Sequence, residues 1–265
     1  RMMNECPLGA AASFGTSWPI DRKITAKLLG FDNPQENSLD AVTNRAEGEI
    51  RIATALALWT QHASTLAQDL ILFSSPPWHL LTIGDAFVTG SSIMPQKRNP
   101  DFAEVTKAKA SLAAAMAGAL LGLTRGDPSG YNREQQWSKY VIMDLFDELA
   151  DAPTVLMGAL ESIQVHKQRM MALMRNDFLE AADVADYLAQ TRKVPFRQTY
   201  RWLGEAVRRS EETGTSLPEA VNLTLRDADT VEELSGKEVQ DLSSPEFLVE
   251  RRRSRGGPAP RSVRD

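Results

Sequence analysis

Apolar residues recur at helical spacing through most of the chain. In the range 52–73 they return at steps of four and three, which places them along one face of a long helix. A second stripe at 105–122 is rich in alanine and glycine, so a neighbouring helix can approach it closely. A third stripe covers 141–163 and contains Pro153, which we expect to kink or interrupt the helix. Since no segment shows the period of a strand, we predict an all-α fold built as a long-helix bundle.

Prolines and glycines mark the ends of the predicted helices. A short helix is expected to open at 19–21 and to end before Gly30, which suits the position just after a helix. Pro76 and Pro77 are expected to stop the first long helix.

The helical pattern changes near 175–177. The helices predicted beyond this point, such as 181–189 and 196–212, are shorter and more charged. We therefore predict two domains, a central helical bundle at 1–174 and a small C-terminal helical domain at 175–265.

Composition narrows the functional classes. The chain has 265 residues, 42% of them hydrophobic and 25% charged, which is typical of a globular protein. A formal net charge of −5 gives no basis for a nucleic-acid or membrane surface. No apolar run reaches the roughly 20 residues that cross a bilayer. The single cysteine, Cys6, cannot form an internal disulfide, so we expect a cytoplasmic protein.

The loop at 90–100 has features that a plain connector does not need. Gly90 and the two serines after it permit an unusual backbone path. Pro100 suits a first helical turn that also contains Asp101 and Glu104, and we expect Asn99 to cap this helix. A flexible stretch joined to an anchored helix can close over a substrate.

The polar groups of this loop fit proton removal next to a carboxylate. Negative charge then builds on the carboxylate, and Lys97 and Asn99 can supply the cation and the donor that stabilise it. Backbone N–H groups and a nearby ammonium can stabilise an alkoxide at Ser91, which would otherwise be a poor base. On the residues alone, a simple connector before a capped helix remains an alternative.

The loop resembles the G-S-S-x-M-P-x-K-x-N loop of the fumarase/aspartase superfamily at every defined position. The resemblance implies β-elimination with release of fumarate, without a metal or an organic cofactor. It implies that Ser91 is the catalytic base and that Lys97 and Asn99 meet the substrate carboxylate. It further implies that Glu104 supports a histidine and that Ser92 binds substrate.

Other segments resemble the argininosuccinate lyase family within this superfamily. The ranges 7–10 and 18–22 are similar to its P-L-G and P-I-D-R segments, and 36–42 is similar to its E-N-S-x-D-A block. Arg45 matches the arginine of its S-x-R-D stretch, which implies a substrate-binding role. The implied reaction is cleavage of argininosuccinate to L-arginine and fumarate in arginine biosynthesis.

A further resemblance begins at Gly130 and continues into the next predicted helix. The segment 130–133 resembles the family's Y-N-[KR] stretch. Its spacing implies that Tyr131, Gln136 and Lys139 bind substrate, although Trp137 and Ser138 replace an acidic pair of the family.

The same family implies a homotetramer in which each active site is shared between subunits. No stretch here matches its T-H segment, whose histidine works with the glutamate, and the chain starts with Arg1. We therefore expect that roughly the N-terminal half of a normal lyase is missing, and that this chain alone is inactive.

Two alternatives remain open. One is another lyase of the superfamily, such as adenylosuccinate lyase, whose loop can also carry Lys-Arg-Asn-Pro. The other is a non-catalytic structural protein on the same scaffold, as in the related lens crystallins. A metal site is not expected, because neither His79 nor His166 has a second potential ligand at metal-ligand spacing in the sequence. His62, on the first long helix, is expected to be a packing residue.

Overall fold

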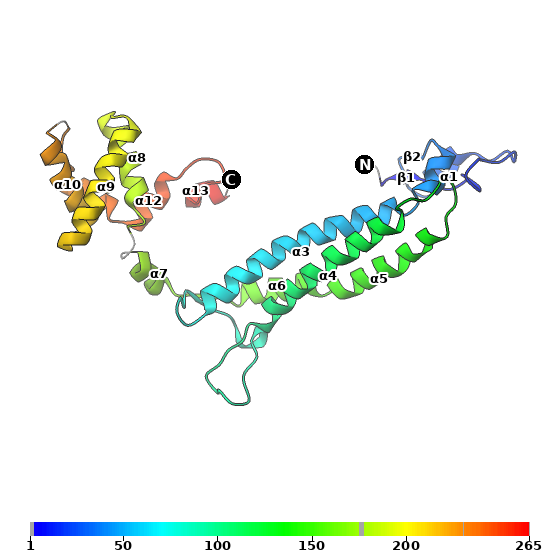
Figure 1. The fold of residues 1–265 in the computed structure, drawn as a ribbon, viewed down its shortest axis with the longest axis horizontal. Coiled ribbons are helices and arrows are strands. Elements are labelled where there is room, and N and C mark those ends of the chain that lie inside the picture. The colour runs from blue at the N-terminus through cyan, green and yellow to red at the C-terminus, as the bar shows by residue number, and fades with distance from the viewer. Residues whose placement is uncertain (1–2, 175–177, 230, 265) are drawn as a thin grey trace. The chain divides into compact units, whose positions relative to one another are not determined.

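The computed structural model describes residues 3–174, 178–229 and 231–264 and confirms the all-α prediction. The chain divides into two compact units, Arg1–Val165 and His166–Asp265 (Figure 1). Each unit is described by itself below. The predicted domain boundary at 174/175 adjoins residues 175–177, which lie outside the described residues, so this boundary stays a prediction.

The first unit holds the long helices. Its elements in chain order are β1 (Glu5–Cys6), α1 (Arg22–Leu28), β2 (Asn33–Pro34), α2 (Ser38–Thr43), α3 (Glu47–Ser74), β3 (Leu81–Thr82), the 3₁₀ turn η1 (Asp85–Phe87), α4 (Asp101–Leu123), the 3₁₀ turn η2 (Glu134–Trp137), α5 (Ser138–Leu149), α6 (Ala152–Glu161) and β4 (Gln164–Val165).

Helices α3, α4 and α5 run side by side in alternating directions and form an elongated bundle (Figure 1). Its buried centre includes Ala53 on α3, Ala113 and Ala117 on α4, and Leu145 on α5. Because alanine side chains are small, the backbones of α3 and α4 can approach closely, as the second sequence stripe predicted. Among the described residues, no helix has the length and apolar character needed to cross a membrane.

Proline and glycine end these helices where the sequence predicted. Helix α3 stops at Ser74, before the two prolines. Pro153 lies in the first turn of α6, which is separated from α5 by a break at residues 150–151. A proline is tolerated in a first turn because its missing N–H has no helical partner there. Gly30 follows α1 with a φ of 80°, a left-handed conformation that glycine adopts without strain.

Close contacts at two glycines hold together the end of the bundle where α3 stops and α4 begins. Strands β3 and β4 pair antiparallel there, and the Gly84 N–H donates to Ser162 Oγ at 3.1 Å. A Cβ added at Gly84 would lie 2.7 Å from Ser162 Cβ, and one added at Gly158 would lie 2.7 Å from Phe87 Cζ. The turn containing η1 can therefore pack against α6 only because both positions lack a side chain.

The second unit is a smaller helical assembly around its own core. Its elements are α7 (Lys167–Met174), α8 (Ala181–Arg192), α9 (Phe196–Thr213), α10 (Leu217–Ala228), α11 (Gly236–Leu242), α12 (Pro245–Arg251) and α13 (Pro260–Arg264). Residues such as Leu188, Trp202, Val221 and Leu242 form the core. Arg252, in the arginine-rich end of the chain, is fixed by two hydrogen bonds to the Asp183 carboxylate at 3.0 and 2.8 Å.

Candidate active-site elements at two ends of the bundle

The loop that precedes α4 is closed at its base by a short antiparallel bridge. The Thr89 N–H donates to Asn99 O at 2.9 Å, and the Asn99 N–H donates to Thr89 O at 2.8 Å. The Thr89 hydroxyl also donates to the Asp101 carboxylate in the first turn of α4. The segment between these anchors can therefore adopt its own path while both of its ends stay fixed.

The prediction that Asn99 caps α4 is wrong. Pro100 occupies the capping position, and no side chain accepts a hydrogen bond from the first turn. The Asn99 backbone is committed to the bridge with Thr89, and its side-chain Nδ2 donates to Gly90 O at 3.4 Å. Asn99 thus stabilises the base of the loop instead of the helix end.

Ser91 sits at the start of this loop with its hydroxyl facing backbone donors. The N–H groups of Ile93 and Met94 both donate to Ser91 Oγ at 3.2 Å. Two donors aimed at one oxygen stabilise negative charge there, which is what an alkoxide requires. Ser91 is half-buried, whereas Ser92 and Lys97 are exposed.

Arg98 was missed by the sequence analysis and anchors the same loop. Its Nη2 donates to Ile83 O at 2.8 Å, and its Nη1 lies 2.5 Å from Asp85 Oδ1. The superfamily motif leaves this position undefined, so nothing in the motif pointed to it. Glu104 lies in the first turn of α4 and is exposed.

The other predicted substrate-binding residues form a second group. Arg45 lies in the turn between α2 and α3, and Tyr131, Gln136 and Lys139 lie in the segment that leads through η2 into α5. Tyr131 Oη accepts a hydrogen bond from Gln136 Nε2 at 2.6 Å. The Arg45 guanidinium lies over the Tyr131 ring, 4.5 Å from its centroid, and Arg45 Nη2 donates to Asn132 O at 2.8 Å. Lys139 is exposed, with its Nζ 4.9 Å from the centroid of the neighbouring Tyr140 ring.

Gln135 also organises this region and was not singled out from sequence. It is 2% exposed, and its Nε2 donates to Thr43 O at 2.7 Å and to Asp127 Oδ2 at 3.1 Å. The Gly130 N–H donates to Thr43 Oγ1 at 2.9 Å. A glutamine between a loop and a helix carries no sequence signal for such a contact, since the partner lies far away along the chain.

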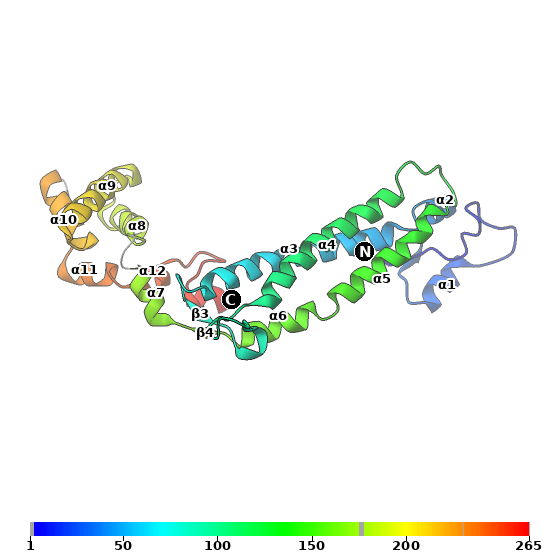
Figure 2. The same ribbon diagram turned by 60° about the horizontal axis from the view of Figure 1, so that its bottom comes forward.

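The structure does not bring the two groups together within one chain. The loop that contains Ser91 precedes α4 and the segment that contains Tyr131 follows it. These two segments lie at opposite ends of the bundle (Figure 2). A helix of 23 residues such as α4 is about 34 Å long at 1.5 Å per residue. Ser91, Ser92, Lys97, Asn99 and Glu104 therefore cannot share a substrate molecule with Tyr131, Gln136 and Lys139 of the same chain.

Two further observations bear on ligands. In the described part of the chain, no group of three or more His, Cys, Asp or Glu side chains is placed to hold a metal ion.

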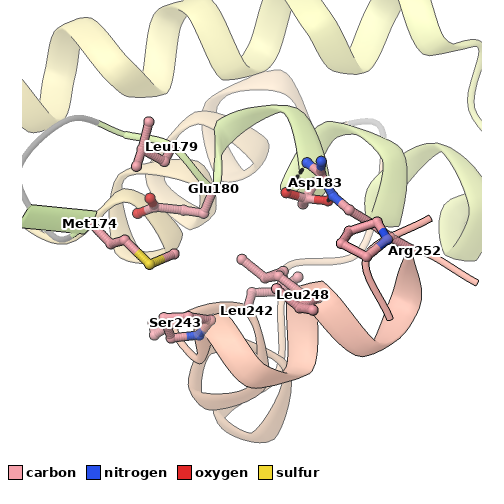
Figure 3. Close-up of a pocket in the computed structure, with 11 residues that line it drawn as sticks. Met174, Leu179, Glu180, Asp183, Leu242, Ser243, Leu248 and Arg252 are labelled. Atoms are coloured by element: carbon pink, nitrogen blue, oxygen red, sulfur yellow. Dashed lines mark hydrogen bonds and ion pairs between the residues drawn. The ribbon is translucent and has the colours of Figure 1, made fainter. Parts of the chain in front are cut away.

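The second unit contains a pocket of about 340 Å³ between α8 and α12. Figure 3 shows Glu180 and Met174 on one side of it, Leu248 on the other, and the Asp183–Arg252 ion pair at its edge.

The chain matches two family models. The model described as lyase matches residues 1–114, and the one described as argininosuccinate lyase C-terminal matches residues 178–250. The argininosuccinate lyase of Thermus thermophilus is 39% identical over 99% of this chain and 56% of its own length. That of Alkalilimnicola ehrlichii is 39% identical over 100% of this chain and 55% of its own length. The chain thus spans little more than half the length of these relatives.

Solved structures agree with this assignment. An EDDS lyase variant with bound fumarate has a TM-score of 0.81 and 25% identity, covering 98% of this chain and 53% of its own. A class II fumarase from Schistosoma mansoni has a TM-score of 0.69 at 13% identity, covering 92% of this chain and 52% of its own, and shows the fold alone. The two family models and the curated relatives confirm the resemblance carried by the loop, and the EDDS lyase structure agrees with it. The chain belongs to the argininosuccinate lyase family of the fumarase/aspartase superfamily.

Proposed function

We propose that this chain is part of an argininosuccinate lyase that cleaves argininosuccinate reversibly to L-arginine and fumarate in cytoplasmic arginine biosynthesis. The observation that carries the proposal is the Ser91 hydroxyl, which accepts two backbone N–H bonds at 3.2 Å in a loop closed by the Thr89–Asn99 bridge. Such a loop suits a serine that must hold negative charge and be brought to a substrate.

In the proposed mechanism, Ser91 removes the proton from the carbon next to a substrate carboxylate. The electron pair left on carbon is delocalised into the carboxylate, where Lys97 and Asn99 stabilise the added charge. When the pair returns, it forms the carbon–carbon double bond of fumarate, and the bond from the neighbouring carbon to the guanidino nitrogen breaks. The electron pair of that bond stays on the nitrogen, which takes up a proton as arginine is released. Ser91 then gives up the proton that it removed from carbon. Glu104 supports a histidine that another segment supplies, and no metal or organic cofactor takes part.

The remaining predicted residues are proposed to bind argininosuccinate from both ends of a bundle. Ser92 contacts it beside Ser91, whereas Tyr131, Gln136 and Lys139 contact it from the opposite end of another copy. Since the serine loop and the Tyr131 region are separated by the length of α4 in one chain, one site requires elements from different copies. We therefore propose a homotetramer with shared active sites, and no turnover by these 265 residues alone.

Exposed apolar residues on the bundle support association between copies. Leu58 on α3 is 61% exposed, Leu121 on α4 is 56% exposed and Met143 on α5 is 57% exposed. Large apolar side chains gathered on one helical bundle are typical of a surface that packs against another protein surface.

A chimera tests the proposed reaction. The N-terminal region of the Thermus thermophilus relative is joined to residue 1 of this chain, and fumarate release from argininosuccinate is followed by ultraviolet absorbance. The chimera is expected to release fumarate, and Ser91→Ala is expected to lower kcat on the order of 10²- to 10⁴-fold. The matched control is Ser111→Ala, which changes an exposed hydroxyl on α4 and is expected to leave kcat unchanged. A folded chimera in which Ser91→Ala keeps its kcat contradicts Ser91 as the base.

The same chimera separates the alternatives. Another lyase of the superfamily would prefer a different substrate, so a panel with argininosuccinate, adenylosuccinate and malate identifies the preferred one. EDDS is added to this panel, because an EDDS lyase structure matches with a TM-score of 0.81. A folded, tetrameric chimera that turns over none of these substrates would favour a structural protein on this scaffold.

A further inference from the structure

Arg45 reaches from the turn between α2 and α3 to the segment that follows α4. Its Nη2 donates to Asn132 O at 2.8 Å, and its guanidinium carbon lies 4.5 Å from the centroid of the Tyr131 ring. Its Nε is buried and has no hydrogen-bond partner among the described residues. One side chain therefore contacts both the backbone and the aromatic ring of the segment expected to bind substrate.

These contacts leave Arg45 poorly placed to bind a carboxylate itself. An arginine usually grips a carboxylate through two parallel N–H bonds, for example from Nε and one terminal nitrogen. Here Nε is buried and Nη2 is occupied by Asn132 O. The guanidinium carbon also lies over the Tyr131 ring, which occupies that side of the group. The pair of donors formed by Nε and Nη2 is thus directed into the protein.

Tyr131, in contrast, is open to an incoming molecule. It is 54% exposed, and it is held at two points: the ring by Arg45 and the hydroxyl by Gln136 Nε2 at 2.6 Å. An exposed aromatic on a loop would otherwise move among several rotamers. The nearby Arg45 guanidinium is the largest cause of a lowered pKa of Tyr131, and the positive charge of Arg133 adds to it. A phenol with a lowered pKa is a stronger hydrogen-bond donor.

The backbone of this segment is also held by contacts other than the one from Arg45 to Asn132 O. Gly130 N–H donates to Thr43 Oγ1 at 2.9 Å, and Gln135 Nε2 donates to Thr43 O at 2.7 Å. Asn132 Nδ2 also closes the local turn by donating to Pro128 O at 2.7 Å. Removal of the Arg45 side chain is therefore expected to free the Tyr131 ring while the loop stays attached.

We propose that Arg45 is a positioning residue that acts through Tyr131, holding its ring and hydroxyl toward the substrate, and does not itself bind substrate. The kinetic part of this proposal rests on the lyase activity proposed above. Its structural part concerns the Arg45–Tyr131 contact and can be tested in the 265-residue chain without any activity.

The first experiment titrates Tyr131 in the 265-residue chain. Tyrosinate absorbance is followed with rising pH in the parent protein and in Arg45→Met, and Tyr131→Phe identifies which of the four tyrosines gives the signal. The pKa of Tyr131 is expected to rise toward its ordinary value in Arg45→Met, with unchanged helical circular dichroism. The control Arg51→Met removes a neighbouring arginine that pairs with Glu47 and is expected to leave the titration unchanged. An unchanged Tyr131 pKa in folded Arg45→Met overturns the proposal.

The second experiment is a double-mutant cycle in the active chimera. Arg45→Met is expected to raise KM for argininosuccinate on the order of 3- to 10-fold with kcat changed by less than about 2-fold. In a Tyr131→Phe background the same change is expected to have little further effect, because both variants disturb one hydroxyl. Arg45→Lys keeps the positive charge, and its KM is expected to lie between those of the parent and Arg45→Met. Arg45→Lys is used in place of Arg45→Met if that variant does not fold. Fully additive effects would mean that Arg45 contacts substrate directly, and would overturn the proposal.

Discussion

Two side chains in the loop before α4 have different roles. Ser91 presents a hydroxyl oxygen to two backbone donors, whereas Arg98 ties the loop to the rest of the unit through Ile83 O and Asp85. The two donors stabilise negative charge on Ser91 Oγ, and the Arg98 contacts hold the loop that carries this atom in place. Both are needed if a loop is to deliver a base to a substrate, because a small displacement of a reacting group costs a large part of the rate.

Arg98→Met is expected to lower kcat/KM of the active chimera by about 10-fold with little change in thermal stability. The Arg98–Asp85 pair is exposed, with side-chain exposures of 46% and 88%, so its loss costs little folding energy. The loop nevertheless loses its link to Ile83 O, and Ser91 becomes less well placed. Steady-state kinetics and thermal unfolding measure the two effects. Arg208→Met, which breaks an exposed pair with Glu205 in the second unit, is the control. An unchanged kcat/KM in Arg98→Met would show that the anchor is not needed.

At the scale of single elements, packing at the loop end of the bundle depends on missing side chains. Gly158 on α6 faces Phe87 of η1, and Gly84 faces Ser162. Glycine weakens a helix, so its presence within α6 is offset by the close approach that it allows. These contacts fix the turn that carries Asp85, and through it the base of the loop.

Gly158→Ala is expected to destabilise the first unit by about 1–3 kcal/mol, because the new Cβ would lie 2.7 Å from Phe87 Cζ and force the ring to shift. Gly122→Ala on α4 is the matched control, since no atom of the part of the chain that the structure describes lies within 4 Å of its added Cβ. That control is expected to stabilise the chain by up to about 1 kcal/mol through helix propensity. Urea unfolding followed by circular dichroism measures both. Equal effects of the two substitutions would contradict the packing argument.

In the second unit, one carboxylate links α8 to the start of α11. Glu238 on α11 accepts hydrogen bonds from Arg192 Nη1 at 2.9 Å and from Tyr187 Oη at 2.8 Å, and it also accepts from the Ser235 N–H. Hydrogen bonding from Arg192 is the main cause that lowers the pKa of Glu238 from 4.5 to about 2. Its side chain is only 18% exposed, so solvent screens this pair weakly.

Glu238→Gln is expected to cost the second unit on the order of 2–3 kcal/mol at neutral pH. The folded pKa of about 2 lies below the unfolded value near 4.5. The stabilisation is therefore complete above about pH 4.5 and is lost as the pH falls toward about 2. Thermal unfolding is measured at neutral pH and near pH 3. The difference in unfolding temperature between the parent and Glu238→Gln is expected to be smaller near pH 3. Glu233→Gln, which removes an exposed pair with Arg226, is expected to change stability less. A difference in unfolding temperature that does not change with pH would contradict stabilisation by the ionised Glu238 carboxylate.

At the scale of the whole chain, sequence periodicity predicted the long helices well and long-range contacts poorly. The stripes at 52–73 and 105–122 became α3 and α4, because apolar spacing and proline positions act locally. The Asn99 cap was wrong, because pairing with Thr89 decided what its backbone and side chain do. The stacking of Arg45 on Tyr131 could not be predicted either, since it requires segments far apart in the sequence to meet. The residues of the predicted site were thus named from the motif, but their separation to two ends of the bundle came only from the fold.

Because of that separation, the proposed site would require association between copies, and Gly118 on α4 provides a way to test this proposal. Among the described residues, nothing lies within 4 Å of a Cβ added at Gly118, and the position is exposed. We therefore expect a larger side chain to leave the fold of the single chain unchanged. If α4 packs closely against another copy, Gly118→Leu adds volume where the two backbones meet. Sedimentation velocity of the active chimera is therefore expected to show a smaller species for Gly118→Leu, together with loss of fumarate release at unchanged helical circular dichroism. Lys237→Leu, an exposed change on α11, should keep the parent mass and activity. A tetramer of parent mass and full activity in Gly118→Leu would mean that this face of α4 does not meet another subunit.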